Sequence, residues 1–159
     1  MRNDPGIGIV GGGIGGLTAA LALLRKGHDV TVFEQASELQ EVGAGLQISP
    51  NGVRVLFDLG LEHEVREICF EPEGKEIRLW NTGDTWKLFD LGVESKARYG
   101  FPYITVHRND LHQVLVKAVE AASPGAIRLD HRFTGIEQRD GHVTLSFHDK
   151  PSATFDVVI

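Results

Sequence analysis

The start of the chain shows two strand-like runs separated by a helical pattern. Residues 7–10 are mostly apolar and bounded by glycine, which predicts a short buried strand. Residues 17–24 place apolar side chains at the i, i+3, i+4 and i+7 positions of one helix face, and Gly27 stands where a helix C-cap belongs. Residues 30–33 predict a second strand. The order of strand, helix and strand predicts a βαβ unit.

A glycine motif with a dinucleotide-binding spacing lies between the first strand and the helix. Gly11 allows the tight turn, Gly13 lets a pyrophosphate approach the backbone, and Gly16 lets the helix lie close to the strand. The free amides and the positive helix end attract phosphates. Glu34 ends the second strand, where its carboxylate suits ribose hydroxyls and repels a 2′-phosphate. FAD or NAD is therefore expected rather than NADP; a glycine-rich turn without a ligand is the weaker alternative.

The middle of the chain is predicted to hold loops, two helices and a hairpin. Residues 35–39 form a loop with some helical character, and the two glycines within residues 42–48 suggest a backbone that passes close to a bulky group. Ser49 is an expected N-cap, with Pro50 at the first helical position, and residues 61–68 form a further short helix. Alternating residues then predict a β-hairpin. Its strands are residues 74–80 and 85–91, joined at residues 81–84.

The last third of the chain predicts one long helix followed by strands. Residues 109–122 keep apolar side chains at helical spacing, with Asn109 as the expected N-cap. Four strands are expected, over residues 126–129, 132–138, 142–147 and 154–159. Tight turns are expected at residues 140–141 and 150–152. A three-stranded antiparallel meander should therefore follow the helix.

The composition of the chain argues against several classes of partner and site. The 159 residues suffice for one domain with a core, and the net charge of −6 argues against a nucleic-acid or anionic-membrane partner. Cys69 is the only cysteine, which excludes an internal disulfide and suits the cytoplasm. The apolar stretch at residues 17–24 is too short to span a membrane.

Arg108 stands at the start of the predicted long helix, where a cation opposes the helix macrodipole. An anionic or polar partner nearby would explain it. A solvated surface arginine is the alternative, and this residue taken alone favours the alternative.

Several segments together resemble the FAD-dependent aromatic-ring monooxygenases, of the salicylate hydroxylase and 3-hydroxybenzoate 6-hydroxylase type. The matching segments are GGGIGGLTAALAL at residues 11–23, VFEQ at 32–35, VGAGLQISPNG at 42–52, VHRNDLHQVL at 106–115 and FDVVI at 155–159. The resemblance covers essentially the whole chain. It implies an α/β fold, with a Rossmann-like FAD-binding βαβ domain, an antiparallel β-meander and a β-hairpin of an interleaved substrate domain.

The resemblance implies an extended FAD, with its pyrophosphate on the glycine motif, its ribose at Glu34, its flavin along residues 44–47, and contacts from Arg108 and Phe133. The implied cofactor-binding residues are Gly11, Gly13, Ile14, Gly15, Gly16, Glu34, Gln35, Ala44, Gly45, Gln47, Arg108 and Phe133. Residues 1–70 and 101–159 would form the FAD-binding domain, with the hairpin segment of the substrate domain at residues 71–100.

In the resembling family, the catalytic groups and the segment that contacts the nicotinamide cofactor come after a strand like that at residues 156–159. The chain is therefore expected to be the FAD-binding portion of a larger enzyme and to be inactive alone, without catalytic or metal-binding residues. The parent enzyme would use NAD(P)H, O2 and an aromatic, phenolic acid-like substrate. The isolated chain would self-associate or pair with a C-terminal part. Two alternatives stay open: a non-catalytic nucleotide-binding module, and another FAD oxidoreductase of the same fold.

Overall fold

The computed structural model describes residues 6–39 and 43–159, which divide into two compact units. Unit 1 combines the chain up to Glu41 with His112–Ile159, and unit 2 comprises Val42–Leu111. The segment that resembles the flavin side of the family begins at Val42, which lies outside the described residues. The assignment of residues 71–100 to a substrate domain stays a prediction.

Unit 1 is built on a four-stranded parallel sheet with the strand order β12–β1–β2–β8. These strands are β1 (Ile7–Val10), β2 (Val30–Phe33), β8 (Ile127–Arg128) and β12 (Val157–Val158). Helix α1 (Ile14–Arg25) connects β1 to β2, which lie parallel and in register. Leu17 and Leu21 on α1 and Val32 on β2 are buried, because the apolar face of the helix packs on the sheet. The predicted βαβ unit is confirmed.

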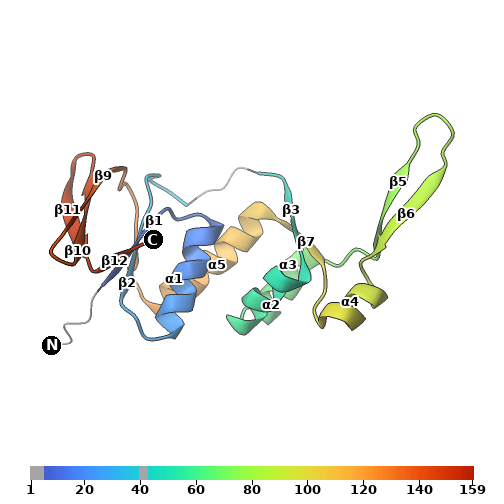
Figure 1. Ribbon diagram of the computed structural model, residues 1–159, viewed down its shortest axis with the longest axis horizontal. Coiled ribbons are helices and arrows are strands. Elements are labelled where there is room, and N and C mark those ends of the chain that lie inside the picture. The colour runs from blue at the N-terminus through green and yellow to red at the C-terminus, as the bar shows by residue number, and fades with distance from the viewer. Residues whose placement is uncertain (1–5, 40–42) are drawn as a thin grey trace. The chain divides into compact units, whose positions relative to one another are not determined.

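A three-stranded antiparallel meander forms another layer of unit 1. Its strands are β9 (Phe133–Arg139), β10 (His142–Phe147) and β11 (Lys150–Phe155), in the order β11–β10–β9. Phe33 of the parallel sheet forms a buried cluster with Leu145 and Phe147 of the meander. In Figure 1 the meander and α1 lie on opposite sides of the parallel sheet. The predicted meander is therefore confirmed as a layer that packs on the sheet. The strand expected over residues 154–159 is wrong, because the structure divides these residues between β11 of the meander and β12 of the parallel sheet.

One of the two predicted meander turns is correct and one is wrong. Asp140 and Gly141 join β9 to β10 with φ of 51° and 82°, as a tight two-residue hairpin requires. The second turn does not lie at residues 150–152, which belong to β11. It lies at His148–Asp149, where Asp149 has a φ of 55°. Pro151 misled the prediction, because a proline marks turns but is also tolerated on an edge strand such as β11.

Unit 2 has a small antiparallel sheet, three helices and a hairpin. Its sheet has the order β3–β7–β4, formed by Gly45–Ile48, Ile104–His107 and Cys69–Phe70 respectively. The helices are α2 (Pro50–Asp58), α3 (Glu62–Ile68) and α4 (Val93–Tyr99). The hairpin comprises β5 (Gly74–Arg78) and β6 (Thr85–Asp90), which confirms its prediction. Helix α4 was not predicted, since its buried residue is the polar Ser95 and its sequence shows no apolar face.

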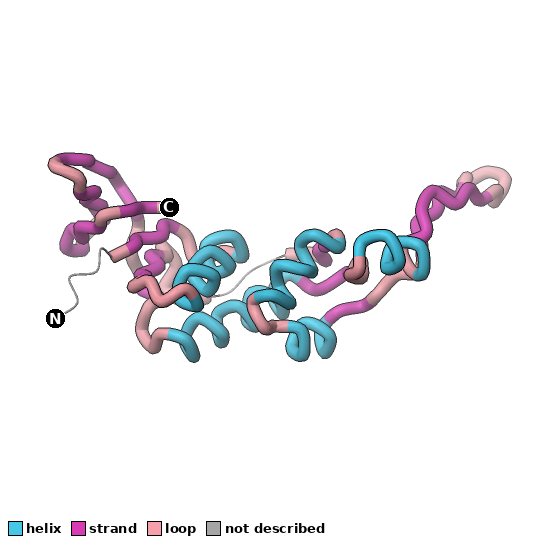
Figure 2. The backbone as a smooth tube through the Cα atoms, turned by 60° about the horizontal axis from the view of Figure 1, so that its bottom comes forward, coloured by secondary structure: helices cyan, strands magenta, loops and turns pink. Residues whose placement is uncertain are grey.

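The hairpin carries exposed apolar side chains. Figures 1 and 2 show β5 and β6 projecting away from α2, α3 and α4 of the same unit. Every residue of the two strands is exposed, including Ile77 and Trp86, which pair across the ladder. An isolated two-stranded hairpin is marginally stable in water, so the hairpin face that carries Ile77 and Trp86 is suited to packing against a further surface.

Three local predictions need correction. Ser49 is the N-cap residue of α2 as predicted, but its hydroxyl donates to Oδ1 of Asn51 and makes no cap hydrogen bond to the helix backbone. The long helix α5 (Arg108–Ala122) begins at Arg108, directly after β7, so Asn109 is inside the helix and is not its N-cap. Residues 35–39 form bends without helical structure. Over residues 6–39 and 43–159, no helix combines the length and the apolar character needed to cross a bilayer.

Candidate functional site

The glycine motif of unit 1 forms the tight turn from β1 into α1. Gly11 has a φ of +113°, in the region that favours glycine, and its N–H donates to the carbonyl of Phe33 at 2.8 Å. A Cβ on Gly16 would lie 2.0 Å from the carbonyl oxygen of Gly11. Among the residues that the structure describes, no atom beyond the neighbouring residues and the helix backbone itself lies within 4 Å of where a Cβ on Gly15 would stand, so that side of the turn is open.

The N-terminus of α1 offers hydrogen-bond donors to an anion. Gly13 is the N-cap, and it has no side chain that could satisfy the amides of the first turn. No acidic residue stands in the first turn, so the positive end of the helix dipole is not neutralised within α1. The turn therefore has both the space and the donors that a pyrophosphate needs.

Glu34, at the end of β2, is held against the glycine turn. Its Oε2 accepts the N–H of Gly12 at 2.8 Å, and its Oε1 accepts the N–H of Ala36 at 2.9 Å. Each carboxylate oxygen has a further lone pair, so the same group can also accept from two ribose hydroxyls. The two hydrogen bonds fix the carboxylate in place and set its charge beside the turn.

His112 on α5 also contacts the turn, which the sequence analysis missed. Its Nε2 lies 2.7 Å from the carbonyl oxygen of Gly12, and the residue is 2% exposed. His112 lines a cavity of about 130 Å³, and the other lining residues are Gly12, Gly13, Glu34, Ala36, Glu38 and Leu39. The signal in the sequence that could have indicated His112 is a polar residue beside the apolar helix positions Leu111 and Leu115.

Two other predicted residues of unit 1 are less closely tied to the turn. Gln35 follows Glu34 and is exposed. Phe133 begins β9, pairs with Phe147 in the ladder and is 39% exposed. The structure thus brings Glu34 to the glycine turn, while the cofactor contacts of Gln35 and Phe133 stay predictions.

The remaining predicted site residues belong to unit 2. Gly45 pairs with His107 in the β3–β7 ladder, immediately before Arg108. A Cβ on Gly43 would lie 2.9 Å from Cδ of Arg108, so the bulky group beside this glycine is the arginine side chain. Ala44 is exposed, and Oε1 of Gln47 accepts a hydrogen bond from Oη of Tyr103 at 2.7 Å. Arg108 is thus packed at the start of the segment expected to meet the flavin.

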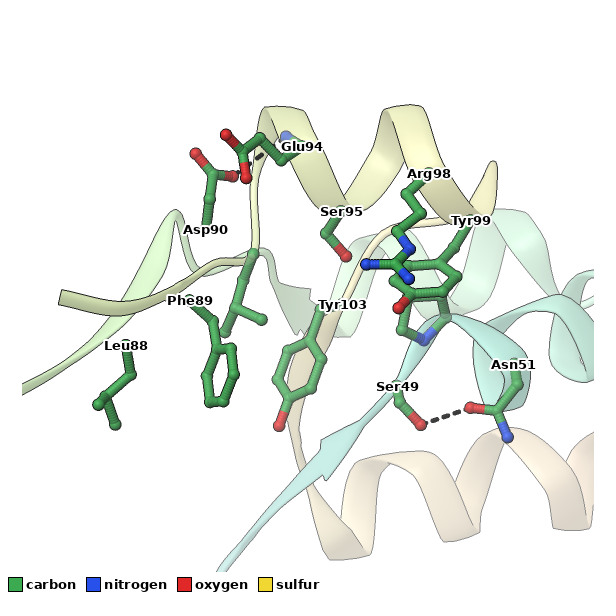
Figure 3. Close-up of a pocket in the computed structure, with 12 residues that line it drawn as sticks. Ser49, Asn51, Leu88, Phe89, Asp90, Glu94, Ser95, Arg98, Tyr99 and Tyr103 are labelled. Carbon is green, nitrogen blue, oxygen red and sulfur yellow. Dashed lines mark hydrogen bonds between the residues drawn. The ribbon is translucent and has the colours of Figure 1, made fainter.

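Unit 2 also has a cavity of about 630 Å³ beside α4. Figure 3 shows Arg98 and Tyr99 of α4, Phe89 of β6 and Tyr103 around it, with Ser49 at the start of α2. The guanidinium of Arg98 lies 5.4 Å from the centre of the Tyr99 ring, within the range of a cation–π contact. Sequence reasoning assigned none of these residues to a binding site, because the cavity depends on α4.

Comparison with known proteins gives consistent matches over most or nearly all of the chain. A family model described as the FAD binding domain matches residues 5–157. The 3-amino-4-hydroxybenzoate 2-monooxygenase PtmB3 of Streptomyces platensis is 40% identical over 158 residues, which cover 99% of this chain and 39% of that protein. The 3-hydroxybenzoate 6-hydroxylase of Polaromonas naphthalenivorans is 35% identical over 137 residues, which cover 86% and 34% respectively.

Among solved structures, HpxO of Klebsiella pneumoniae in complex with FAD and uric acid superposes with a TM-score of 0.80. It is 26% identical, and the match covers 99% of this chain and 39% of that one. The chain thus spans well under half the length of each of these proteins.

Proposed function

The chain belongs to the FAD-binding-domain family of the aromatic-ring monooxygenases, and from this premise we propose that it holds FAD in an enzyme that hydroxylates an aromatic compound. The family expected from the sequence motifs is thereby confirmed. The observation that carries the proposal for this chain is the glycine turn, where Gly12 donates to Glu34 at 2.8 Å.

The residues of unit 1 fit the pyrophosphate and adenosine ribose of FAD. The amides after Gly13 would hold the pyrophosphate, because no side chain caps them and the helix dipole favours an anion there. Glu34 would accept hydrogen bonds from the ribose hydroxyls with lone pairs that the backbone amides leave available. When bound, FAD supplies the redox chemistry, while the protein binds and orients it.

The residues of unit 2 would contact the flavin end of the cofactor. Arg108 supplies a cation beside Gly43, and Ala44, Gly45 and Gln47 are exposed on the adjoining segment and strand. An exposed backbone with a nearby guanidinium suits a planar ring that carries hydrogen-bonding oxygens.

The partners of the whole enzyme follow from the relatives. One is named for 3-amino-4-hydroxybenzoate and another for 3-hydroxybenzoate, so we propose an aromatic substrate with a ring hydroxyl for the parent of this chain. We also propose O2 and NAD(P)H as its co-substrates, on family membership alone. No residue of this chain is assigned to the chemical step.

FAD titration of the chain, followed by quenching of flavin fluorescence, tests the proposal. We expect saturable binding that Glu34→Gln weakens by roughly ten- to hundredfold, because a hydrogen bond to a charged group contributes about 1.5–3 kcal/mol. The amide also places an NH2 group against the N–H of Gly12 or Ala36. Glu38→Gln, which removes the same charge four residues away on the cavity rim, should bind within about threefold of the parent chain.

Two outcomes would count against the proposal. Absence of saturable FAD binding by the unaltered chain would contradict it, although family membership would stand. Equal weakening by Glu34→Gln and Glu38→Gln would show that only overall charge matters, and not the geometry of Glu34.

We further propose that the chain self-associates through the exposed face of the β5–β6 hairpin. The support is the row of apolar side chains on two strands that are exposed throughout.

A further inference from the structure

Packing alone does not explain a histidine at the centre of unit 1. His112 is 2% exposed, and its Nδ1 is a buried atom without a hydrogen-bond partner among the residues that the structure describes. A buried polar atom without a partner costs about 1–3 kcal/mol. A leucine would fill a similar space without that cost. The reason for a histidine at this position must therefore lie in the hydrogen bond that its other ring nitrogen, Nε2, makes.

That hydrogen bond defines which ring nitrogen carries a proton. A carbonyl oxygen can only accept, so Nε2, at 2.7 Å from the oxygen of Gly12, must be the donor. His112 therefore presents an N–H to the glycine turn from a position 100 residues later in the chain.

Gly12 is held on both sides of its Cα. Its N–H donates to Oε2 of Glu34 at 2.8 Å, and its carbonyl oxygen accepts from His112 at 2.7 Å. The peptide that follows is planar and trans, so the direction of the Gly12 carbonyl also sets the opposite direction of the Gly13 N–H. Without these two contacts, a run of glycines would populate many backbone conformations.

We propose that His112 is a positioning residue of the cofactor site, which fixes the Gly12–Gly13 peptide so that the Gly13 amide is directed at the pyrophosphate. This rests on the proposed function, because the anion is that of FAD. Holding the turn in its binding conformation before the ligand arrives removes an ordering cost from the binding free energy.

Two substitutions separate the donor from the ring. His112→Gln keeps an N–H donor at about the reach of Nε2, whereas His112→Leu fills the space without a donor. We expect the dissociation constant for FAD to rise on the order of tenfold in His112→Leu, about 1.4 kcal/mol, and to stay within about threefold of the parent chain in His112→Gln.

His131→Leu is the matched control. Nδ1 of His131 lies 2.6 Å from the carbonyl oxygen of Leu129, so this variant also removes a histidine-to-backbone hydrogen bond from unit 1, but one that involves no residue of the glycine turn. It should lose thermal stability and keep its FAD affinity. Should His112→Leu fail to fold, His112→Asn, whose shorter side chain does not reach the Gly12 carbonyl, takes its place.

A second measurement tests the role directly. ADP and adenosine are each used to compete with FAD for the parent chain and for the variant that lacks the donor. The variant should bind ADP more weakly than the parent does and adenosine equally well, because only ADP has the pyrophosphate. A donor-less variant that binds FAD and ADP as the parent does, or that weakens ADP and adenosine equally, would overturn the inference. Failure of the unaltered chain to bind FAD would instead overturn the proposed function and this inference with it.

Discussion

Gly16 occupies a position where the backbone leaves no room for a side chain. A Cβ there would meet the carbonyl oxygen of Gly11 at 2.0 Å, and a backbone atom cannot move aside as the end of a flexible side chain can. Its neighbour Gly15 faces open space within the same helix. The two adjacent glycines therefore have different roles. Gly16 is required by the fold, while Gly15 leaves space beside the turn for a ligand to approach.

The contrast gives a direct stability prediction. Gly16→Ala should lower the free energy of unfolding by roughly 1–3 kcal/mol, because the turn must open to admit the methyl group. Gly15→Ala should raise it by about 0.5–1 kcal/mol, since alanine has less backbone entropy to lose in a helix. Urea denaturation measures both, and equal effects of the two substitutions would contradict this account of the turn.

Cys69 is a residue whose chemistry is set by its surroundings. Burial raises the pKa of the Cys69 thiol, and the charge of Glu71 raises it further, while Arg66 opposes the rise. The folded state therefore favours the neutral thiol. Its contribution to stability is complete below the pKa of the unfolded thiol and is lost as the pH rises through the folded-state pKa.

Alkylation of Cys69 by iodoacetamide should therefore be slow near neutral pH, with a midpoint of its pH dependence above that of an exposed cysteine thiol. Glu71→Gln should move that midpoint down and speed the reaction severalfold at pH 8. Glu73→Gln removes the same charge two residues further on and should change the rate less. A midpoint that Glu71→Gln leaves in place would show that Glu71 does not act on the thiol.

At the scale of elements, the β5–β6 hairpin gives the clearest prediction. Its cross-strand pair Ile77 and Trp86 is exposed, so the hairpin presents apolar surface together with open strand edges. Sedimentation of the chain over a concentration series should show association that Ile77→Thr with Trp86→Thr reduces. Threonine keeps the strand propensity.

Lys87→Thr is the control for the hairpin variant, because it changes the neighbouring position of the same strand without removing apolar surface. It should not reduce association. A parent chain that stays monomeric across the series would contradict the assignment of this face.

The elements that the sequence predicted well are those with local causes. Helix α1 and its turn follow from glycines and apolar spacing within a few residues, and the Asp140–Gly141 turn follows from two residues that accept a positive φ. The turn at residues 148–149 was missed because Lys150, Pro151 and Ser152 have a stronger turn composition. The role of His112 was out of reach, because its partner lies 100 residues away and only tertiary packing brings them together.

At the scale of the whole molecule, the two units differ in whether their residues are continuous in sequence. Unit 2 is one continuous segment, while unit 1 needs residues from both sides of it. The glycine turn shows the same division, since Glu34 comes from the segment before unit 2 and His112 from the segment after it. A site of this kind cannot be completed by either segment alone.

The pairing of β1 with β12 has a consequence for synthesis on the ribosome. Ile7 pairs with Val157, so the first strand to be made receives its outer neighbour only about 150 residues later, which at about 5–20 residues per second is roughly 8–30 s. Unit 2 can emerge whole during that interval, whereas the nascent first strand lacks its β12 neighbour until residues 157–158 have been made. The order of translation therefore makes the nucleotide-binding sheet the last part of this chain to close.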